Sequence, residues 1–111
     1  MKQLEIELRN GENLILEVTP LFLEYAEDYE GGIKKLQEDM KVLEEDSKGI
    51  RVMNHLLYAI VASNHKEELS YGEAVRLVKI EDIARIVGFI NEELPEVSEV
   101  ASKQNRIKHR R

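Results

Sequence analysis

Cysteine is absent from this sequence, and long apolar runs are absent too. Without cysteine the chain has no disulfide, no catalytic thiolate and no cysteine-based zinc site, which suits a reducing compartment. The longest uncharged apolar stretch, residues 56–62, is far too short to cross a bilayer. The first residues also lack the apolar run of a signal peptide. We therefore expect a cytoplasmic protein with no membrane span.

Signatures of catalysis are missing as well. The sequence contains no glycine-rich phosphate loop and no G-x-S-x-G motif. His55 and His65 stand ten residues apart, which fits neither a helical zinc pair nor a zinc finger. The acid pairs at 44–45, 67–68 and 92–93 fall on predicted solvated faces or loops. Acid–base catalysis by two carboxyl groups needs an apolar pocket that separates their pKa values, and we expect no such pocket there. We expect no enzymatic activity, no metal, no cofactor and no small-molecule substrate.

Charge divides the chain into two parts. The last eleven residues hold no acid and five of the 16 bases, namely Lys103, Arg106, Lys108, Arg110 and Arg111. Residues 1–100 therefore carry 11 bases beside all 22 acids, a formal charge of −11. Such an acidic body repels phosphate backbones, so nucleic-acid binding by the body is disfavoured. The basic end can contact RNA, an acidic partner or its own body, or it can simply be a solvated terminus.

Length and composition predict one packed domain. At 111 residues and 42% hydrophobic content, the chain has the size and the apolar material for one core. We expect an α+β fold, mainly α-helical, with an N-terminal β-hairpin packed on about five helices. The globular domain is predicted over residues 1–95, with the hairpin at 3–19 and helices at 20–94. Residues 96–111 are predicted to form a basic, flexible C-terminal tail.

The hairpin is predicted from alternating residues on either side of Asn10-Gly11. Apolar and polar residues alternate over 4–9 and again over 13–18. A two-residue turn would place the two apolar sets on opposite faces, so the loop must contain an odd number of residues, three or five. We expect Gly11 or Asn13 to have a positive φ. The expected pairs are Leu8 with Leu14, Ile6 with Leu16, and Leu4 with Val18.

Helices are predicted for most of the remaining chain. Thr19-Pro20 has the form of a cap followed by proline at the first helical position, and Gly31-Gly32 interrupts that helix. An amphipathic helix is predicted over 33–46. Residues 50–64 are apolar nearly all round, apart from a polar stripe of Arg51, Asn54, His55 and Tyr58, so we expect a central helix there.

The next two predicted helices offer an alternative function. Ser70 and Glu73 form a capping box that opens a short helix, and a further amphipathic helix ends before Pro95. Together, residues 70–94 could form the helix-turn-helix of a small DNA-binding regulator. The second helix, however, offers Arg85 and Asn91 among four acids, whereas a recognition helix needs a basic surface.

Aromatic and apolar residues in the first two predicted helices are candidates for partner binding. Tyrosines with Phe22 can serve as interface anchors, and the apolar face of 33–46 can meet a partner helix or a second copy. The competing interpretation is that these side chains, together with Tyr58 and Tyr71, cover the domain's own core. The candidate partner-binding residues are Phe22, Tyr25, Tyr29, Ile33, Leu36, Met40 and Leu43.

The order of these segments resembles the tail assembly chaperones of long-tailed phages and prophages of Gram-positive bacteria. The resemblance covers about residues 3–94 and is carried by the segments PLFLEYAEDY, LLYAIVASN and LSYGEAVRLVKIEDIARIVGFINEEL. It implies a non-enzymatic, mostly helical protein of the bacterial cytoplasm that binds the tape measure protein and the tail tube protein during assembly. Many members of the family are also made in a longer form by frameshifting near the end of the gene. The basic tail stands where such a form would continue.

Overall fold

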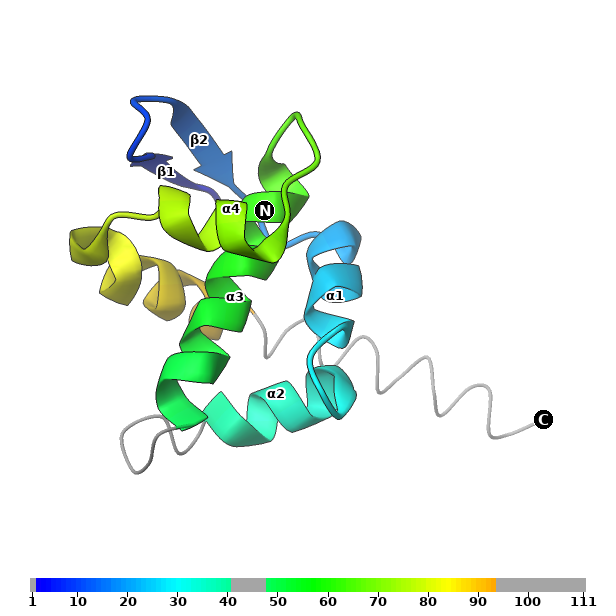
Figure 1. Ribbon diagram of the computed structural model, residues 1–111. Helices are drawn as coiled ribbons and strands as arrows, with labels where there is room; N and C mark the ends of the chain where they lie inside the picture. Colours follow the sequence, from blue (N-terminus) through cyan, green and yellow to red (C-terminus); the bar gives the residue numbers. More distant parts are fainter. Residues whose placement is uncertain (1, 41–47, 94–111) are drawn as a thin grey trace.

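The chain folds as α+β and is mainly helical, with an antiparallel hairpin followed by five α-helices in the described residues (Figure 1). The computed structural model describes residues 2–40 and 48–93. Helix α3 (Lys48–Asn64) lies at the centre and contacts α1 (Pro20–Glu27), α2 (Gly32–Met40), α4 (Tyr71–Leu77) and strand β2 (Asn13–Leu16). A helix over residues 83–93 lies on the other side of α3 from α1 (Figure 1). The predicted fold class and the central position of 50–64 are confirmed.

The hairpin joins β1 (Leu4–Glu7) to β2 (Asn13–Leu16) with a register that corrects the prediction. Leu4 pairs with Leu16 and Ile6 with Leu14, so every pair is shifted by two residues from the expected one. The cause is the turn. Leu8 donates to the Glu12 carbonyl (2.7 Å) and accepts from Gly11 N–H (2.9 Å), which encloses a three-residue loop.

Gly11 sets the shape of this loop. Its φ of +91° is left-handed, as expected for Gly11 or Asn13, and it completes a type I turn followed by a glycine bulge. The number of loop residues is odd, so the apolar side chains of both strands share one face and become buried against the helices. The predicted face was therefore correct, although the predicted pairs were wrong.

Backbone and side-chain groups of the helices hold the hairpin at both edges. Along β1, Arg9 N–H donates to the Leu77 carbonyl (2.8 Å), and the Arg85 guanidinium donates to the Glu5 carbonyl (3.4 Å). Just beyond β2, the Asn64 amide accepts from Glu17 N–H (3.3 Å) and donates to the Glu17 carbonyl (3.0 Å). The amide thus satisfies both backbone groups of Glu17, as a neighbouring strand would.

Local signals in the sequence define helices α1 and α2. Thr19 caps α1 by accepting from Phe22 N–H (3.3 Å), and proline occupies the first helical position, as predicted. Gly31 and Gly32 have φ values of +95° and +80°, which only glycine adopts without strain, and they separate α1 from α2. Beyond Met40 the predicted helix over 33–46 lies outside the described residues.

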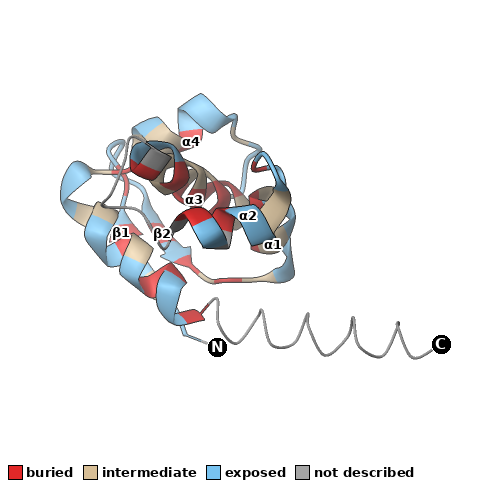
Figure 2. Ribbon diagram, turned by 90° about the horizontal axis from the view of Figure 1, so that it is seen from below, coloured by how far each residue is buried: buried red, intermediate tan, exposed pale blue. Residues whose placement is uncertain are grey.

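The core forms where the other elements face α3 (Figure 2). Leu56, Ile60 and Val61 of α3 are fully buried. Val52 and Leu57 of α3 are fully buried too, and the hairpin, α1, α2 and the helix over 83–93 contribute further large side chains, which are Leu8, Leu16, Phe22, Leu36, Ile86 and Ile90. The hairpin and the five α-helices thus supply apolar side chains to one core, and a two-stranded hairpin alone would be only marginally stable.

The capping box at the start of α4 is present as predicted. Ser70 Oγ accepts from Glu73 N–H (3.2 Å), and the Glu73 carboxylate accepts from Ser70 N–H (3.0 Å). These hydrogen bonds from Ser70 lower the pKa of Glu73. A short 3₁₀ turn, η1 (Ile80–Asp82), then leads into the helix over 83–93. The predicted boundary at residue 95 and the basic tail at 96–111 lie outside the described residues.

Candidate protein-binding surface

Five aromatic rings from separate parts of the chain meet on one side of α3. We name this group the aromatic cluster and define it as Tyr25, Tyr29, His55, Tyr58 and Tyr71. α1 supplies the first ring, the turn after α1 the second, α3 the histidine and Tyr58, and α4 the last. The cluster forms because α1 and α4 both pack on α3.

The rings of the cluster contact one another mainly edge to face. Tyr25 and Tyr58 have centroids 5.3 Å apart with planes at 89°, and Tyr29 and His55 are 5.2 Å apart at 75°. Tyr58 also lies 5.6 Å from His55 and 5.5 Å from Tyr71. These separations are the preferred ones for aromatic pairs, in which the positive edge of one ring meets the negative face of another.

The solvent exposure of the rings increases from one end of the cluster to the other. Tyr29 at one end is only 8% exposed, whereas Tyr71 at the other end is 45% exposed. Tyr25, His55 and Tyr58 between them are half-buried. The cluster thus presents aromatic surface to solvent while its inner end joins the core, which is the arrangement expected of rigid anchor residues in an interface.

Burial and neighbouring acids set the protonation of the cluster. Burial, followed by the hydrogen bond to Asp39, raises the pKa of Tyr29 to about 12; the Tyr29 hydroxyl donates to that carboxylate at 2.6 Å. Burial, followed by the charge of Asp28, raises the pKa of Tyr58. Burial lowers the pKa of His55, so the neutral ring is favoured, and its Nε2–H can donate to the Tyr25 carbonyl at 3.2 Å.

The structure separates the predicted partner-binding residues into three groups. Phe22 and Leu36 are fully buried and belong to the core, so they offer no surface to a partner in this conformation. Tyr25 and Tyr29 lie in the aromatic cluster, and Ile33 is half-buried beside the core. The side chain of Met40 and the whole of Leu43 lie outside the described residues.

Three members of the cluster, the half-buried His55 and Tyr58 and the exposed Tyr71, are not among those predicted residues. The sequence places His55 and Tyr58 in a polar stripe of the central helix, and the interpretation as core side chains covers Tyr58 and Tyr71 too. A signal was present, because His55 and Tyr58 are three residues apart on the only polar stripe of an otherwise apolar helix. Tyr71 carries no such signal, since only the packing of α4 on α3 brings it to Tyr58.

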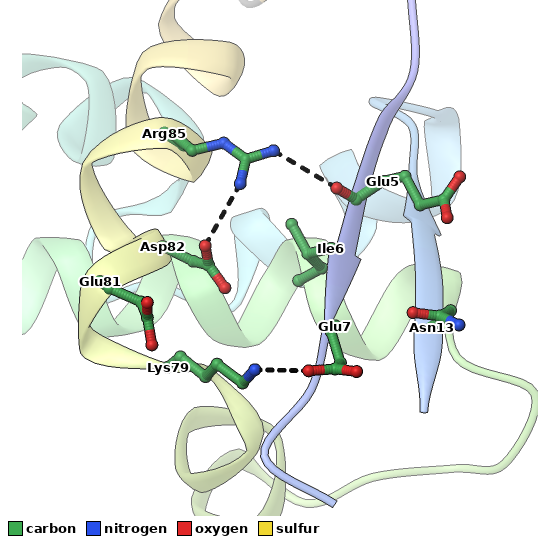
Figure 3. A pocket seen from close by; sticks show the side chains of 8 residues that line it. All are labelled: Glu5, Ile6, Glu7, Asn13, Lys79, Glu81, Asp82 and Arg85. Carbon is green, nitrogen blue, oxygen red and sulfur yellow. Dashed lines mark hydrogen bonds and ion pairs between the residues drawn. The ribbon is translucent and has the colours of Figure 1, made fainter. Parts of the chain in front are cut away.

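A second surface feature is a hollow of about 380 Å³ between β1 and residues 79–85 (Figure 3). Lys79 Nζ lies 2.6 Å from Glu7 Oε1, and Arg85 lies 3.3 Å from Asp82 Oδ1. The hydrogen bond from Lys79 lowers the pKa of Glu7. Two of the four carboxylates that line the hollow, those of Glu7 and Asp82, are thus paired with its two bases.

The same contacts bear on the helix-turn-helix alternative. α4 and the helix over 83–93 do follow each other as expected, with η1 between them. Lys79, however, is directed at Glu7, and Arg85 is directed at Asp82 and the Glu5 carbonyl (Figure 3). A DNA-binding protein would direct such donors to phosphates and base edges, whereas here Lys79 and Arg85 donate to groups of the protein itself.

His55 and His65, the two histidines weighed above as metal ligands, make different local contacts. His55 belongs to the aromatic cluster, whereas His65 Nδ1 accepts from Glu67 N–H at 3.1 Å. His65 Nε2 lies 3.3 Å from the Glu12 carboxylate, so the ring brings the hairpin loop next to the end of α3. Within residues 2–40 and 48–93, no three histidine or acidic side chains are grouped so as to hold a metal ion.

Comparisons with known proteins identify no relative. No protein-family model, no curated protein and no solved structure matches this chain. In the part of the chain that the structure describes, none of the helices combines the length and the apolar character that crossing a membrane requires.

Proposed function

We propose that the protein is a non-enzymatic, cytoplasmic tail assembly chaperone of a phage or prophage. It binds the tape measure protein and the tail tube protein while the tail is built. The family rests on the resemblance of residues 3–94 described above. The observation from the structure that carries the binding role is the aromatic cluster, whose outermost ring, Tyr71, is 45% exposed while Leu56 and Ile60 of α3 are fully buried.

The exposure of Tyr71 supports binding more than a purely structural role. A tyrosine that only completes a core would bury its ring, as Phe22 does. Here three half-buried rings and one exposed ring form a continuous aromatic surface held by three helices. Tyrosine supplies a large contact area with few rotatable bonds, and its hydroxyl can form hydrogen bonds with water or with a partner. It therefore suits a surface that is exposed to solvent in the free protein and buried in a complex.

Co-expression tests this proposal. The tagged chain and the tape measure protein of the same genome are produced together, with the tail tube protein in a parallel experiment. We expect the chain to copurify with the tape measure protein and to increase its soluble fraction. The double variant Tyr58→Ala/Tyr71→Ala should lose both effects, while the control Ile50→Ala/Ile80→Ala, which trims two exposed side chains outside the cluster, should keep them. A genome without a tape measure gene, or equal capture by both variants, would contradict the proposal.

DNA binding by residues 70–94 remains the second candidate and has its own test. A regulator would be retained on a DNA column in a salt-dependent manner, because phosphate contacts release counterions. The pairing of Lys79 and Arg85 within the protein and the acidic body both predict that the chain elutes at low salt. Retention that falls steeply with salt and is lost in Arg76→Gln, whose side chain is exposed on α4, would favour the regulator instead.

A further inference from the structure

Asn10 is the only asparagine in the chain that glycine follows. Glycine has no Cβ, so its backbone nitrogen can approach the side-chain amide of the preceding residue with the least steric hindrance. Asn10 and Gly11 are both exposed, in the three-residue loop of the hairpin, where water reaches them. The Asn10-Gly11 step therefore favours spontaneous loss of the side-chain amide more than any other step in the sequence.

The reaction at this step is an internal substitution followed by hydrolysis. Hydroxide removes the proton from Gly11 N, the nitrogen attacks Asn10 Cγ, and the bond from Cγ to Nδ2 breaks. The leaving nitrogen takes a proton from water and departs as ammonia, which leaves a cyclic imide in the main chain. Water then adds to one of the two imide carbonyl carbons, and the bond from that carbon to nitrogen breaks. Opening at Cγ gives aspartate and opening at the main-chain carbonyl gives isoaspartate, so water is the only co-reactant.

In the folded loop both reacting groups are held by other residues. Gly11 N–H donates to the Leu8 carbonyl at 2.9 Å. The Asn10 amide is held twice by Glu12, because its Oδ1 accepts from Glu12 N–H (3.0 Å) and its Nδ2 donates to the Glu12 carboxylate (2.6 Å). Ring closure must turn the amide carbon and Gly11 N towards each other, and this movement breaks those hydrogen bonds. The reaction thus requires that the loop open first.

We propose that Asn10 is a site of spontaneous deamidation and that the hydrogen bonds of the folded loop set its rate. Glu12 acts as a positioning residue, since it holds both polar atoms of the amide. This inference does not depend on the proposed function.

The product weakens the contact between the hairpin loop and the end of α3. Aspartate at position 10 places an acceptor where Nδ2 now donates, so two carboxylates face each other and repel. The other oxygen of Glu12, Oε2, lies 3.3 Å from Nε2 of His65, whose side chain is only 7% exposed. Repulsion that moves Glu12 therefore loosens the loop from the residue that follows α3.

Peptide mass spectrometry on the full chain tests the inference. The protein is incubated at mildly alkaline pH in buffer and in urea, and deamidation is followed at Asn10 and at Asn13, an exposed asparagine of the same hairpin that precedes leucine. In urea Asn10 should react much faster than Asn13. In buffer Asn10 should react at least about tenfold more slowly than in urea, because the loop hydrogen bonds must break first. Equal rates at the two asparagines in urea, or equal rates at Asn10 with and without urea, would overturn the inference.

Glu12→Ala separates the effect of the loop from that of the sequence. It removes the carboxylate that accepts from Asn10 and leaves the Asn10-Gly11 step unchanged. The rate in buffer should rise by about threefold, as expected for the loss of one exposed hydrogen bond, while the rate in urea should not change. Glu5→Ala is the matched control, since Glu5 is an exposed acid of the same hairpin that pairs with Ile15, away from the loop. An unchanged rate in Glu12→Ala, or an equal rise in Glu5→Ala, would contradict the role of the loop.

Asn10→Asp reproduces the aspartate product and tests its consequence. Hydrogen exchange at the Leu8 and Gly11 amides should be about threefold faster than in the wild type, because repulsion between exposed carboxylates opens the loop more often. Leu23 N–H, which donates to the Thr19 carbonyl in α1, is the internal control and should keep its rate. Unchanged exchange at Leu8 and Gly11 would show that the product does not loosen the loop and would reject that part of the inference.

Discussion

The two faces of α3 are covered in different ways. On the aliphatic face, Leu56, Ile60 and Val61 are fully buried beneath the hairpin and the neighbouring helices. On the aromatic face, His55 and Tyr58 stay half-buried beneath rings whose outermost member, Tyr71, is 45% exposed. Both faces belong to one helix, so the difference arises from what packs on each. The aliphatic face should therefore contribute most to the stability of the fold, while under the proposed function the exposed part of the aromatic face is the surface that a partner covers.

The largest expected effect comes from removing side-chain volume on the aliphatic face. Ile60→Ala should lower the free energy of unfolding by about 3 kcal/mol, because it deletes buried methyl groups and leaves a cavity. Chemical denaturation measures the change. Ile50→Ala is the matched control on the same helix, because Ile50 is 66% exposed and its loss should change stability by less than about 0.5 kcal/mol. Equal effects at both positions would refute the assignment of the two faces.

The inner end of the aromatic cluster should behave like core. Tyr29→Phe removes the hydroxyl that donates to Asp39 at 2.6 Å and leaves this buried carboxylate with one hydrogen bond fewer. We expect a loss of about 1–2 kcal/mol in the free energy of unfolding. Tyr71→Phe, at the exposed end, should leave stability unchanged. If Tyr29→Phe left the free energy of unfolding unchanged, the inner end of the cluster would not behave like core.

Titration with base should identify the inner end of the cluster, Tyr29. In the folded chain the pKa of Tyr29 is raised from 10.0 to about 12, so the folded state keeps a proton that the unfolded chain releases. Its contribution to stability is therefore complete below pH 10 and is lost as the pH rises towards 12. Ultraviolet titration should show Tyr29 ionising last, and Tyr29→Phe should remove that step. Simultaneous ionisation of all four tyrosines near pH 10 would contradict this.

The cap of α4 should affect the aromatic face through Tyr71, the first residue of that helix. Ser70→Ala removes the acceptor for Glu73 N–H and should cost about 1 kcal/mol. Ser70→Asp, which retains a cap acceptor, should restore most of this stability. The ring signal of Tyr71 should broaden in the alanine variant and recover in the aspartate variant. Identical spectra in the two variants would show that the cap does not position Tyr71.

The smallest effect on stability is expected at the outermost ring. Tyr71→Ala should change the free energy of unfolding by less than about 0.5 kcal/mol, because the side chain is 45% exposed and has no hydrogen-bond role in the described structure. Differential scanning calorimetry measures this change. A loss as large as that of Ile60→Ala would mean that the aromatic face supports the fold in the same way as the aliphatic face.

The hairpin shows how much of the fold the sequence could predict. Alternation over residues 4–8 and 14–18 established the strands, and parity established which side chains share a face. Neither distinguishes registers that differ by two residues, because both place the same side chains inward. The register was decided by the geometry of the turn, in which Gly11 takes the left-handed conformation and leaves Leu8 opposite Glu12.

The candidate site was harder to predict than the helices. Caps and glycines specified α1 and α4 locally, so their starts were correct. Periodicity shows which residues share a helix face, but it does not show which segment will cover that face. Phe22 and Leu36 therefore looked like anchors although they are core, and Tyr71 joins Tyr58 only because α4 packs on α3.

The affinity of the purified chain for the tape measure protein of the same genome tests the central claim most directly. Titration calorimetry compares the wild type with Tyr71→Ala after both have been shown to unfold with the same free energy. If the aromatic face is the binding surface, the variant should bind at least about tenfold more weakly, as expected for the loss of a tyrosine anchor. Equal affinity of the two proteins would contradict the claim and leave the aromatic cluster as an edge of the core.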